Sequence, residues 1–375
     1  RSMVLQSAAR APRAALRMLS TVPMPPGLVT KTPLLESAPL SALVGTTVLL
    51  KLDALQPSGS FKDRGMAYMG AELKKQGATS LISSSGGNAG LAVATVGRKL
   101  GMAVRVIVPT TTKPIMLEKI RAQSAEVTVH GANWNEADEL ARELVAADAA
   151  AEYVPPYEDP LLWRGHSSIV DELAEAGVRP GGMVASVGGG GLVAGLFEGL
   201  ERHGWADCTV ITAETEGACC FAAGMEAGRP VRLDAITSVA TSLGALQASD
   251  TAIARAQAHP TLPKVVSDAE AVGACAALLD DHRLLVEPAC GAALALLYSE
   301  RHRAALAAFD PLVVVVCGGR CAQAPPPPHT THTPTPAPRT PTHPLPFQRP
   351  PRRFRRRAPL CSHRECRHLL LGRSG

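Results

Sequence analysis

The stretch Met183-Val184-Ala185-Ser186-Val187-Gly188-Gly189-Gly190-Gly191-Leu192 decides the fold class. Its first five residues form a short apolar run, as in a buried strand, and an apolar helical pattern extends from Leu192 to His203. The four glycines between them allow the tight turn that joins a strand to a following helix. The stretch therefore predicts one strand–turn–helix unit of a parallel α/β sheet.

The same alternation of short apolar runs and helical patterns extends over residues 32–320, without an internal repeat. A chain of 375 residues has room for two domains, so we expect two open parallel sheets with a cleft between them. Strands are expected at 48–52, 80–84, 104–108, 126–130, 183–187, 209–214 and 312–317. Helices are expected at 67–76, 89–100, 114–123, 135–147, 192–203, 269–281 and 291–303.

The two ends of the chain carry most of its positive charge. Residues 1–35 hold four arginines and one lysine with no acid, and residues 321–375 hold ten arginines and one acid. The ends contribute +5 and +9 to a total of +5, which leaves −9 for residues 36–320. An acidic folded part gives no reason to expect nucleic-acid binding by it.

Residues 1–24 are interpreted as a leader. They place Arg1, Arg10, Arg13 and Arg17 among Ala, Ser and Leu, which fits a mitochondrial or plastid transit peptide. A disordered leader without a targeting role has the same composition.

Residues 321–375 are predicted to form a disordered Pro/Arg-rich tail, because 13 of the 31 prolines lie there and little apolar area can be buried. The basic cluster within 352–357 is interpreted as solvated, with nucleic acid or anionic lipid as the alternative contact.

The nine cysteines are odd in number and contain no CxxC pair, which indicates free thiols in a reducing compartment, either the cytoplasm or an organelle. No stretch reaches the roughly 18 apolar residues that a membrane helix needs.

Lys62 ends the run Gln56-Pro57-Ser58-Gly59-Ser60-Phe61-Lys62, which consists mainly of turn-forming residues. A lysine on such a loop can face a cleft, where partial loss of water lowers the pKa of its amine and favours Schiff-base formation. Taken alone, the run also fits a solvated surface lysine.

Two loops have the composition of anion sites. The run Ser83-Ser84-Ser85-Gly86-Gly87-Asn88-Ala89-Gly90 joins hydroxyls and backbone N–H groups to a helix N-terminus, which suits a carboxylate. The four glycines 188–191 also lie between an expected strand and an expected helix, and they suit a phosphate. They match neither GxGxxG nor a P-loop. Ordinary strand-to-helix turns are also glycine-rich.

The run Val313-Val314-Val315-Val316-Cys317-Gly318-Gly319 places a thiol at the carboxyl end of an expected buried strand, where α/β sheets bind ligands. Alone, Cys317 would be interpreted as a core cysteine. An amine for a Schiff base, a phosphate loop and a carboxylate loop together indicate pyridoxal phosphate as cofactor.

With these motifs in this order, the chain resembles the fold-type II pyridoxal-phosphate enzymes, which have the tryptophan synthase β-like fold. Within that group it looks most like the L-serine/L-threonine dehydratases of animal-liver type. The resemblance covers about residues 30–320, and residues 32–37, 155–160, 165–168 and 285–293 support it. It implies a large cofactor-binding domain formed by 25–55 and 160–320, and a small domain, 56–159, with the Schiff-base lysine and the substrate loop.

The resemblance also implies roles for single residues. Lys62 would bind the cofactor as a Schiff base and remove the α-proton of serine, which leads to pyruvate and ammonia, or to 2-oxobutanoate from threonine. Phe61 would flank the ring, Asn88 would contact its hydroxyl, and Cys317 would face its nitrogen, where a neutral thiol favours β-elimination. Gly188, Gly189, Gly190, Gly191 and Leu192 would bind the phosphate, and Ser85, Gly86, Asn88 and Ala89 the substrate carboxylate.

A homodimer and a monovalent cation, K⁺, are further expectations from the resemblance. The positions that match the cation site are the side chain of Glu214 and the carbonyl groups of Gly188, Ala218, Leu243 and Ala245.

Two other activities of the group remain as alternatives. Serine racemase needs a second base, a serine at the position of Gly86, so racemisation is disfavoured here. The ending Lys62-Asp63-Arg64-Gly65 looks more like threonine synthase, since the liver dehydratases usually carry an apolar residue after the lysine.

The end of the folded part departs from the family pattern. Arg320 and Cys321 lead directly into the proline-rich tail, whereas the family continues with an Asn-containing turn and a closing helix. A frame shift or an unspliced intron would explain the departure. The non-catalytic alternative is a pseudoenzyme that binds cofactor but cannot close its site.

Overall fold

The computed structural model describes residues 21–319. The predicted tail, 321–375, lies outside these residues, and so does the predicted leader, 1–24, apart from its last four residues. Within these four residues, Val22 is buried and its N–H donates to Asp171 Oδ2 at 2.9 Å, and the leader's end stays a prediction. Packing against the folded part therefore includes residue 22.

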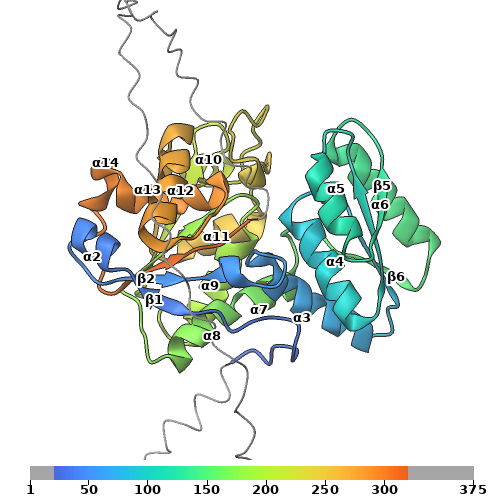
Figure 1. Ribbon diagram of the computed structural model, residues 1–375, viewed down its shortest axis with the longest axis horizontal. Helices are drawn as coiled ribbons and strands as arrows, with labels where there is room; N and C mark the ends of the chain where they lie inside the picture. The colour runs from blue at the N-terminus through green and yellow to red at the C-terminus, as the bar shows by residue number, and fades with distance from the viewer. Residues whose placement is uncertain (1–20, 320–375) are drawn as a thin grey trace, which may run out of the picture. The chain divides into compact units, whose positions relative to one another are not determined.

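Six strands form the larger sheet, in the order β1-β2-β10-β7-β8-β9 (Figure 1). All neighbours are parallel except β1, which runs antiparallel to β2. All four residues of β10 are buried, as expected for a continuous apolar run inside a parallel sheet. The bounds are Leu34–Glu36 (β1), Val48–Lys51 (β2), Gly182–Ser186 (β7), Thr209–Thr215 (β8), Thr261–Val266 (β9) and Leu312–Val315 (β10).

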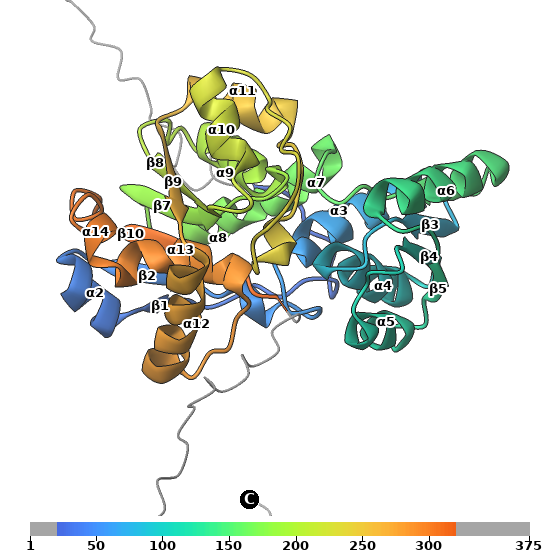
Figure 2. The same ribbon diagram turned by 90° about the horizontal axis from the view of Figure 1, so that it is seen from above.

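Four parallel strands form the smaller sheet, in the order β5-β4-β3-β6. Figure 2 shows α6 on one side of this sheet and α4 and α5 on the other. Ile82 and Ile107 pack with Ala137 and Ala141 of α6, whereas alternate residues such as Val106 join the main core, which is the period-2 pattern of a strand. The bounds are Ser80–Ser83 (β3), Ala103–Val108 (β4), Glu126–Val129 (β5) and Ala151–Tyr153 (β6).

Helix α3 (Lys62–Lys75) packs on helices that belong to both sheets: α4 (Asn88–Leu100), which covers the smaller sheet, and α7 (Pro160–His166), which packs on α9 (Gly191–Arg202). On the larger sheet, α13 contacts β7, β8 and β10 and lies under α12. The remaining bounds are Ala38–Val44 (α2), Pro114–Arg121 (α5), Trp134–Ala147 (α6), Ser168–Glu175 (α8), Cys220–Ala227 (α10), Asp250–Ala258 (α11), Asp268–His282 (α12), Pro288–Tyr298 (α13), Glu300–Arg303 (α14), and the short 3₁₀ helices Asp53–Leu55 (η1) and Thr241–Leu243 (η2).

The predicted α/β class is confirmed, but the sequence did not predict every element, and predicted elements differ at their ends. The missed elements are β1, β6, β9, α2, α7, α8, α10 and α11. Lys62 was predicted on a loop before a helix at 67–76, but it is the first residue of α3. The helix begins early because Arg64 and Gly65 are buried in its first turns and pack against α7, where no exposed turn could form. The predicted helix 291–303 is two helices, α13 and α14, separated by the extended backbone of Ser299.

All strands of the larger sheet lie within 25–55 and 160–320, and all strands of the smaller sheet within 56–159. Residues 21–319 nevertheless belong to one compact unit, so the domain boundaries stay a prediction. Every helix of this unit is too short or too polar to span a membrane.

Candidate active site

The loop before Lys62 is tied to the end of strand β10. Ser60 forms a bridge with Gly318, Phe61 N–H donates to the carbonyl of Cys317 at 3.0 Å, and Gly319 N–H donates to Gly59 at 2.9 Å. These bonds hold Lys62 at the carboxyl end of a strand of the larger sheet, where parallel sheets form their ligand sites.

The amine of Lys62 donates to the backbone carbonyl of Pro156 at 2.5 Å and lies 5.1 Å from the centre of the Phe61 ring. Loss of water on burial lowers the pKa of Lys62 to about 8, although the charge of Glu287 acts in the opposite direction. A larger fraction of this amine is therefore neutral and nucleophilic near neutral pH than in a solvated lysine.

Gly188 to Gly190 lie between β7 and α9, as predicted, and Gly191 is the first residue of α9. Gly190 has φ of +95°, and a Cβ on Gly189 would overlap the ring of Tyr157. Side chains therefore cannot enter this loop, and its N–H groups at the start of a 12-residue helix form a cradle that suits an anion.

The second loop, 84–87, lies between β3 and α4, again as predicted. Ser85 Oγ accepts from Gly87 N–H at 3.4 Å, which closes a tight turn. Asn88 begins α4, and its side-chain amide donates to Glu287 Oε1 at 2.7 Å. Since Glu287 stands beside the larger sheet's Gly319, this bond brings the loop of the smaller sheet to the lysine.

Cys317 lies two residues beyond the end of β10, which is shorter than predicted. A hydrogen bond with Cys290, together with burial, raises the pKa of the Cys317 thiol well above its usual value. The thiol therefore stays protonated and neutral at physiological pH.

Two residues of this site were missed from the sequence as functional candidates, Glu287 and the carbonyl of Pro156. Both lie in stretches that supported the family resemblance. A single acid before a proline, inside the otherwise apolar stretch 285–293, was the one available signal for Glu287.

Contacts connect some of the candidate cation residues. Glu214 accepts from the N–H groups of Phe221 and Ala222 at 2.9 and 2.7 Å, and burial raises its pKa to about 8. Gly188 packs on Leu243, and Ala218 forms a bridge with Thr215. The carbonyl of Leu243 already accepts from Ala245 N–H at 2.7 Å. Within residues 21–319, no group of three His, Cys, Asp or Glu side chains could hold a metal ion.

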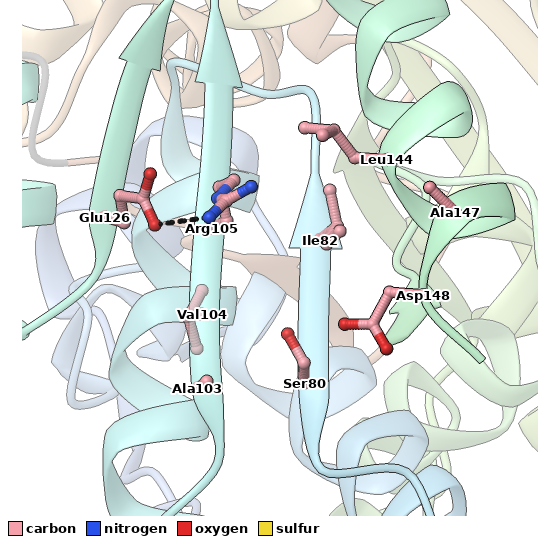
Figure 3. Close-up of a pocket in the computed structure, with 9 residues that line it drawn as sticks. All are labelled: Ser80, Ile82, Ala103, Val104, Arg105, Glu126, Leu144, Ala147 and Asp148. Atoms are coloured by element: carbon pink, nitrogen blue, oxygen red, sulfur yellow. Dashed lines mark ion pairs between the residues drawn. The ribbon is translucent and has the colours of Figure 1, made fainter. Parts of the chain in front are cut away.

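A pocket of about 230 Å³ lies elsewhere, on the smaller sheet (Figure 3). The first residues of β3 and β4, Ser80 and Ala103, line it together with Asp148 and the ion pair between Arg105 and Glu126. None of the candidate site residues lines this pocket, and it lies toward the strand starts, whereas the two loops follow the strand ends.

Known proteins resemble the chain over most of its length. The family model described as pyridoxal-phosphate-dependent enzyme matches residues 26–318. The human L-serine dehydratase/L-threonine deaminase is 45% identical over 296 residues, which covers 77% of this chain and 90% of the relative. The L-serine dehydratase of Dictyostelium discoideum is 38% identical and covers 81% and 91%.

Solved structures give the same picture. A fungal L-serine ammonia-lyase from Rhizomucor miehei matches with a TM-score of 0.73 and 35% identity, covering 78% of this chain and 94% of that one. Maize serine racemase has a similar TM-score, 0.74, but at 22% identity it shows the fold alone. The chain belongs to the family of pyridoxal-phosphate-dependent enzymes.

Proposed function

We propose that this chain is an ammonia-lyase that converts L-serine to pyruvate and ammonia, and L-threonine to 2-oxobutanoate and ammonia. The observation that carries the proposal is the Lys62 amine, which is partly desolvated, has a lowered pKa and lies beside two loops suited to anions. The relatives at 38–45% identity carry the names of the same reaction.

The residues fit pyridoxal phosphate. The four-glycine loop has no room for side chains, and it lies at the N-terminus of α9. Its backbone N–H groups can therefore approach a phosphate closely. Gly188, Gly189, Gly190, Gly191 and Leu192 would hold that phosphate. Phe61 would flank the ring, Asn88 would meet its hydroxyl, and the neutral thiol of Cys317 would face its nitrogen.

When bound, pyridoxal phosphate supplies an electron-withdrawing ring that accepts the electron pair freed at the substrate Cα. Lys62 would hold the cofactor covalently and, once released by the incoming amino acid, take the proton from Cα. The carbonyl of Pro156 offers the freed amine a hydrogen-bond acceptor in this position. Ser85, Gly86, Asn88 and Ala89 would bind the substrate carboxylate at the start of α4.

Gly86 supports elimination over racemisation, because position 86 itself carries no side chain that could act as a second base. A Cβ on Gly86 would lie 2.6 Å from Thr112 Oγ1, so a serine there would require Thr112 to move. We also expect a homodimer, and K⁺ near Glu214. The six free cysteines of residues 21–319 support a reducing compartment.

The test compares wild type, Lys62→Ala and the exposed control Lys75→Ala on the same helix. Each is loaded with pyridoxal phosphate and given L-serine, and pyruvate, ammonia and D-serine are measured. We expect equal amounts of pyruvate and ammonia from wild type and the control, and a decrease of roughly 10³-fold or more for Lys62→Ala.

Other outcomes separate the alternatives. D-serine as the main product would favour the racemase. A cofactor absorbance band without pyruvate would favour the pseudoenzyme, and neither band nor product would refute the proposal.

A further inference from the structure

Asp138 on α6 is 9% exposed and lies at the centre of a polar cluster on the smaller sheet. Its Oδ1 accepts from Ser84 Oγ at 2.7 Å and, in a short hydrogen bond, from the hydroxyl of Tyr153. Its Oδ2 accepts from Arg142 Nε at 2.8 Å, and the guanidinium of Arg142 lies 4.3 Å from the centre of the Tyr153 ring. The cluster consists of these four residues.

The cluster stands on an apolar face. The neighbours of Asp138 on this face of α6 are Ala137 and Ala141, which pack with Ile82 and Ile107. A buried carboxylate in such a place is unfavourable unless its oxygens are hydrogen-bonded. Burial alone would raise the pKa of Asp138, but the bonds from Tyr153, Arg142 and Ser84 outweigh it and leave the pKa lowered. A small apolar side chain would fill the same space without this requirement, so packing alone does not account for Asp138.

Ser84 and Tyr153, which both donate to Asp138 Oδ1, each lie just before a chain segment of the candidate site. Ser84 comes directly before Ser85 and the turn of the substrate loop. Tyr153 ends β6, and three residues later the carbonyl of Pro156 accepts the hydrogen bond from Lys62. Val154 N–H also donates to the carbonyl of Ile82 at 2.8 Å, so the ends of β3 and β6 lie side by side.

We propose that Asp138 is a positioning residue for the reaction. By holding Ser84 and Tyr153 on one oxygen, it fixes the substrate loop relative to the carbonyl that binds the Lys62 amine. The bound amino acid and the Lys62 amine are then held in a fixed position relative to each other. This inference rests on the proposed function, but part of its test does not require turnover.

The test uses Asp138→Asn, which keeps the size of the side chain and loses its charge, with Glu139→Gln as a matched exposed control on the same helix. Loss of the charge weakens the hydrogen bonds that hold Ser84 and Tyr153, so we expect KM for L-serine to rise about 10-fold. The affinity for unreactive glycine, read from the cofactor absorbance, should fall by a similar factor. Affinity for pyridoxal phosphate should stay within about 2-fold, because the four-glycine cradle belongs to the larger sheet.

Ser84→Ala, Tyr153→Phe and the double variant test the shared oxygen. Their effects on glycine affinity should be non-additive in the Asp138 background and small in the Asp138→Asn background. Ser84 Oγ and the Tyr153 hydroxyl also lie 3.1 Å apart, so it is the loss of their coupling in the Asp138→Asn background that assigns the coupling to Asp138. Should Asp138→Asn fail to fold, additive effects of Ser84→Ala and Tyr153→Phe would still overturn the inference.

Two results would overturn the inference. One is additive effects of Ser84→Ala and Tyr153→Phe. The other is an Asp138→Asn protein that melts at lower temperature but keeps wild-type KM and glycine affinity, which is the behaviour of a purely structural residue. If wild type produced no pyruvate, the proposed function would fail, and the glycine measurement would still decide the role of Asp138.

Discussion

The two loops of the candidate site follow the same plan but are packed differently. Each follows a parallel strand and opens a helix. In the loop of the larger sheet, a Cβ on Gly189 would overlap Tyr157, and one on Gly188 would lie 3.0 Å from the backbone of Leu243. In the loop of the smaller sheet, a Cβ on Gly87 would meet nothing closer than 3.9 Å. The first loop therefore has no room for a Cβ at Gly188 or Gly189, whereas the second has open space at Gly87 and only the side chain of Thr112 against Gly86.

Of the substitutions that test this difference between the loops, Gly189→Ala is expected to have the largest effect on cofactor affinity. In Gly189→Ala the new methyl group must displace the Tyr157 ring, and overpacking of this kind typically costs 1–3 kcal/mol. We expect affinity for pyridoxal phosphate to fall about 10- to 100-fold, measured by titration of the cofactor absorbance.

The matched control is Gly87→Ala in the other loop, where the backbone is extended and the space is open. It should leave cofactor affinity within about 3-fold of wild type. Equal losses in the two variants would remove the contrast between the loops.

A smaller effect is expected at Gly86. A Cβ there would lie 2.6 and 2.7 Å from Oγ1 and Cγ2 of Thr112, which are the ends of a side chain and can be removed. We expect Gly86→Ala to lower kcat/KM for L-serine about 10-fold, and Gly86→Ala/Thr112→Ala to recover most of that loss. Exposed Thr111→Ala serves as the control, and a double variant no better than Gly86→Ala would show that Thr112 is not the obstacle.

A further effect, on stability rather than on affinity or turnover, concerns the start of α3, which carries Lys62 and Asp63. Asp63 accepts from Ser58 N–H at 2.6 Å, and burial raises its pKa to about 6. Since the folded state then holds this proton more tightly than the unfolded state, wild type loses stability as pH rises from about 4 to about 6.

Asp63→Asn removes this titration. Its unfolding free energy relative to wild type should therefore increase by about 2 kcal/mol between pH 4 and pH 7, measured by denaturant unfolding at each pH. A constant difference over this range would mean that Asp63 titrates normally.

The sequence was most informative where local pattern decides the structure. The apolar runs at 183–187 and 313–316 predicted strands because burial in a parallel sheet imposes that composition on both faces. The glycines 188–191 predicted a tight strand-to-helix turn because glycine tolerates the left-handed backbone of Gly190 and needs no space for a Cβ at Gly189. The position of Lys62 beside Cys317 followed from the order of these motifs along a known type of fold.

Other features depend on partners distant in the sequence. Glu287 and Asn88 are hydrogen-bonded although they lie 199 positions apart in the sequence, and Asp138 and Ser84 although they lie 54 apart. No local sequence pattern could predict either pair. Strand β9 was missed because it contains Pro263, which an edge strand tolerates. The start of α3 was missed because Phe61, the residue before it, offers no side-chain cap.

The central claim is that Lys62 is the lysine that carries the cofactor. The most direct test loads the full chain with pyridoxal phosphate, reduces the covalent link with borohydride, and locates the modified peptide by mass spectrometry. The account predicts one modified residue, Lys62, and no labelled peptide from Lys62→Ala. A reduced cofactor on any other lysine, with Lys62 unmodified, would contradict it.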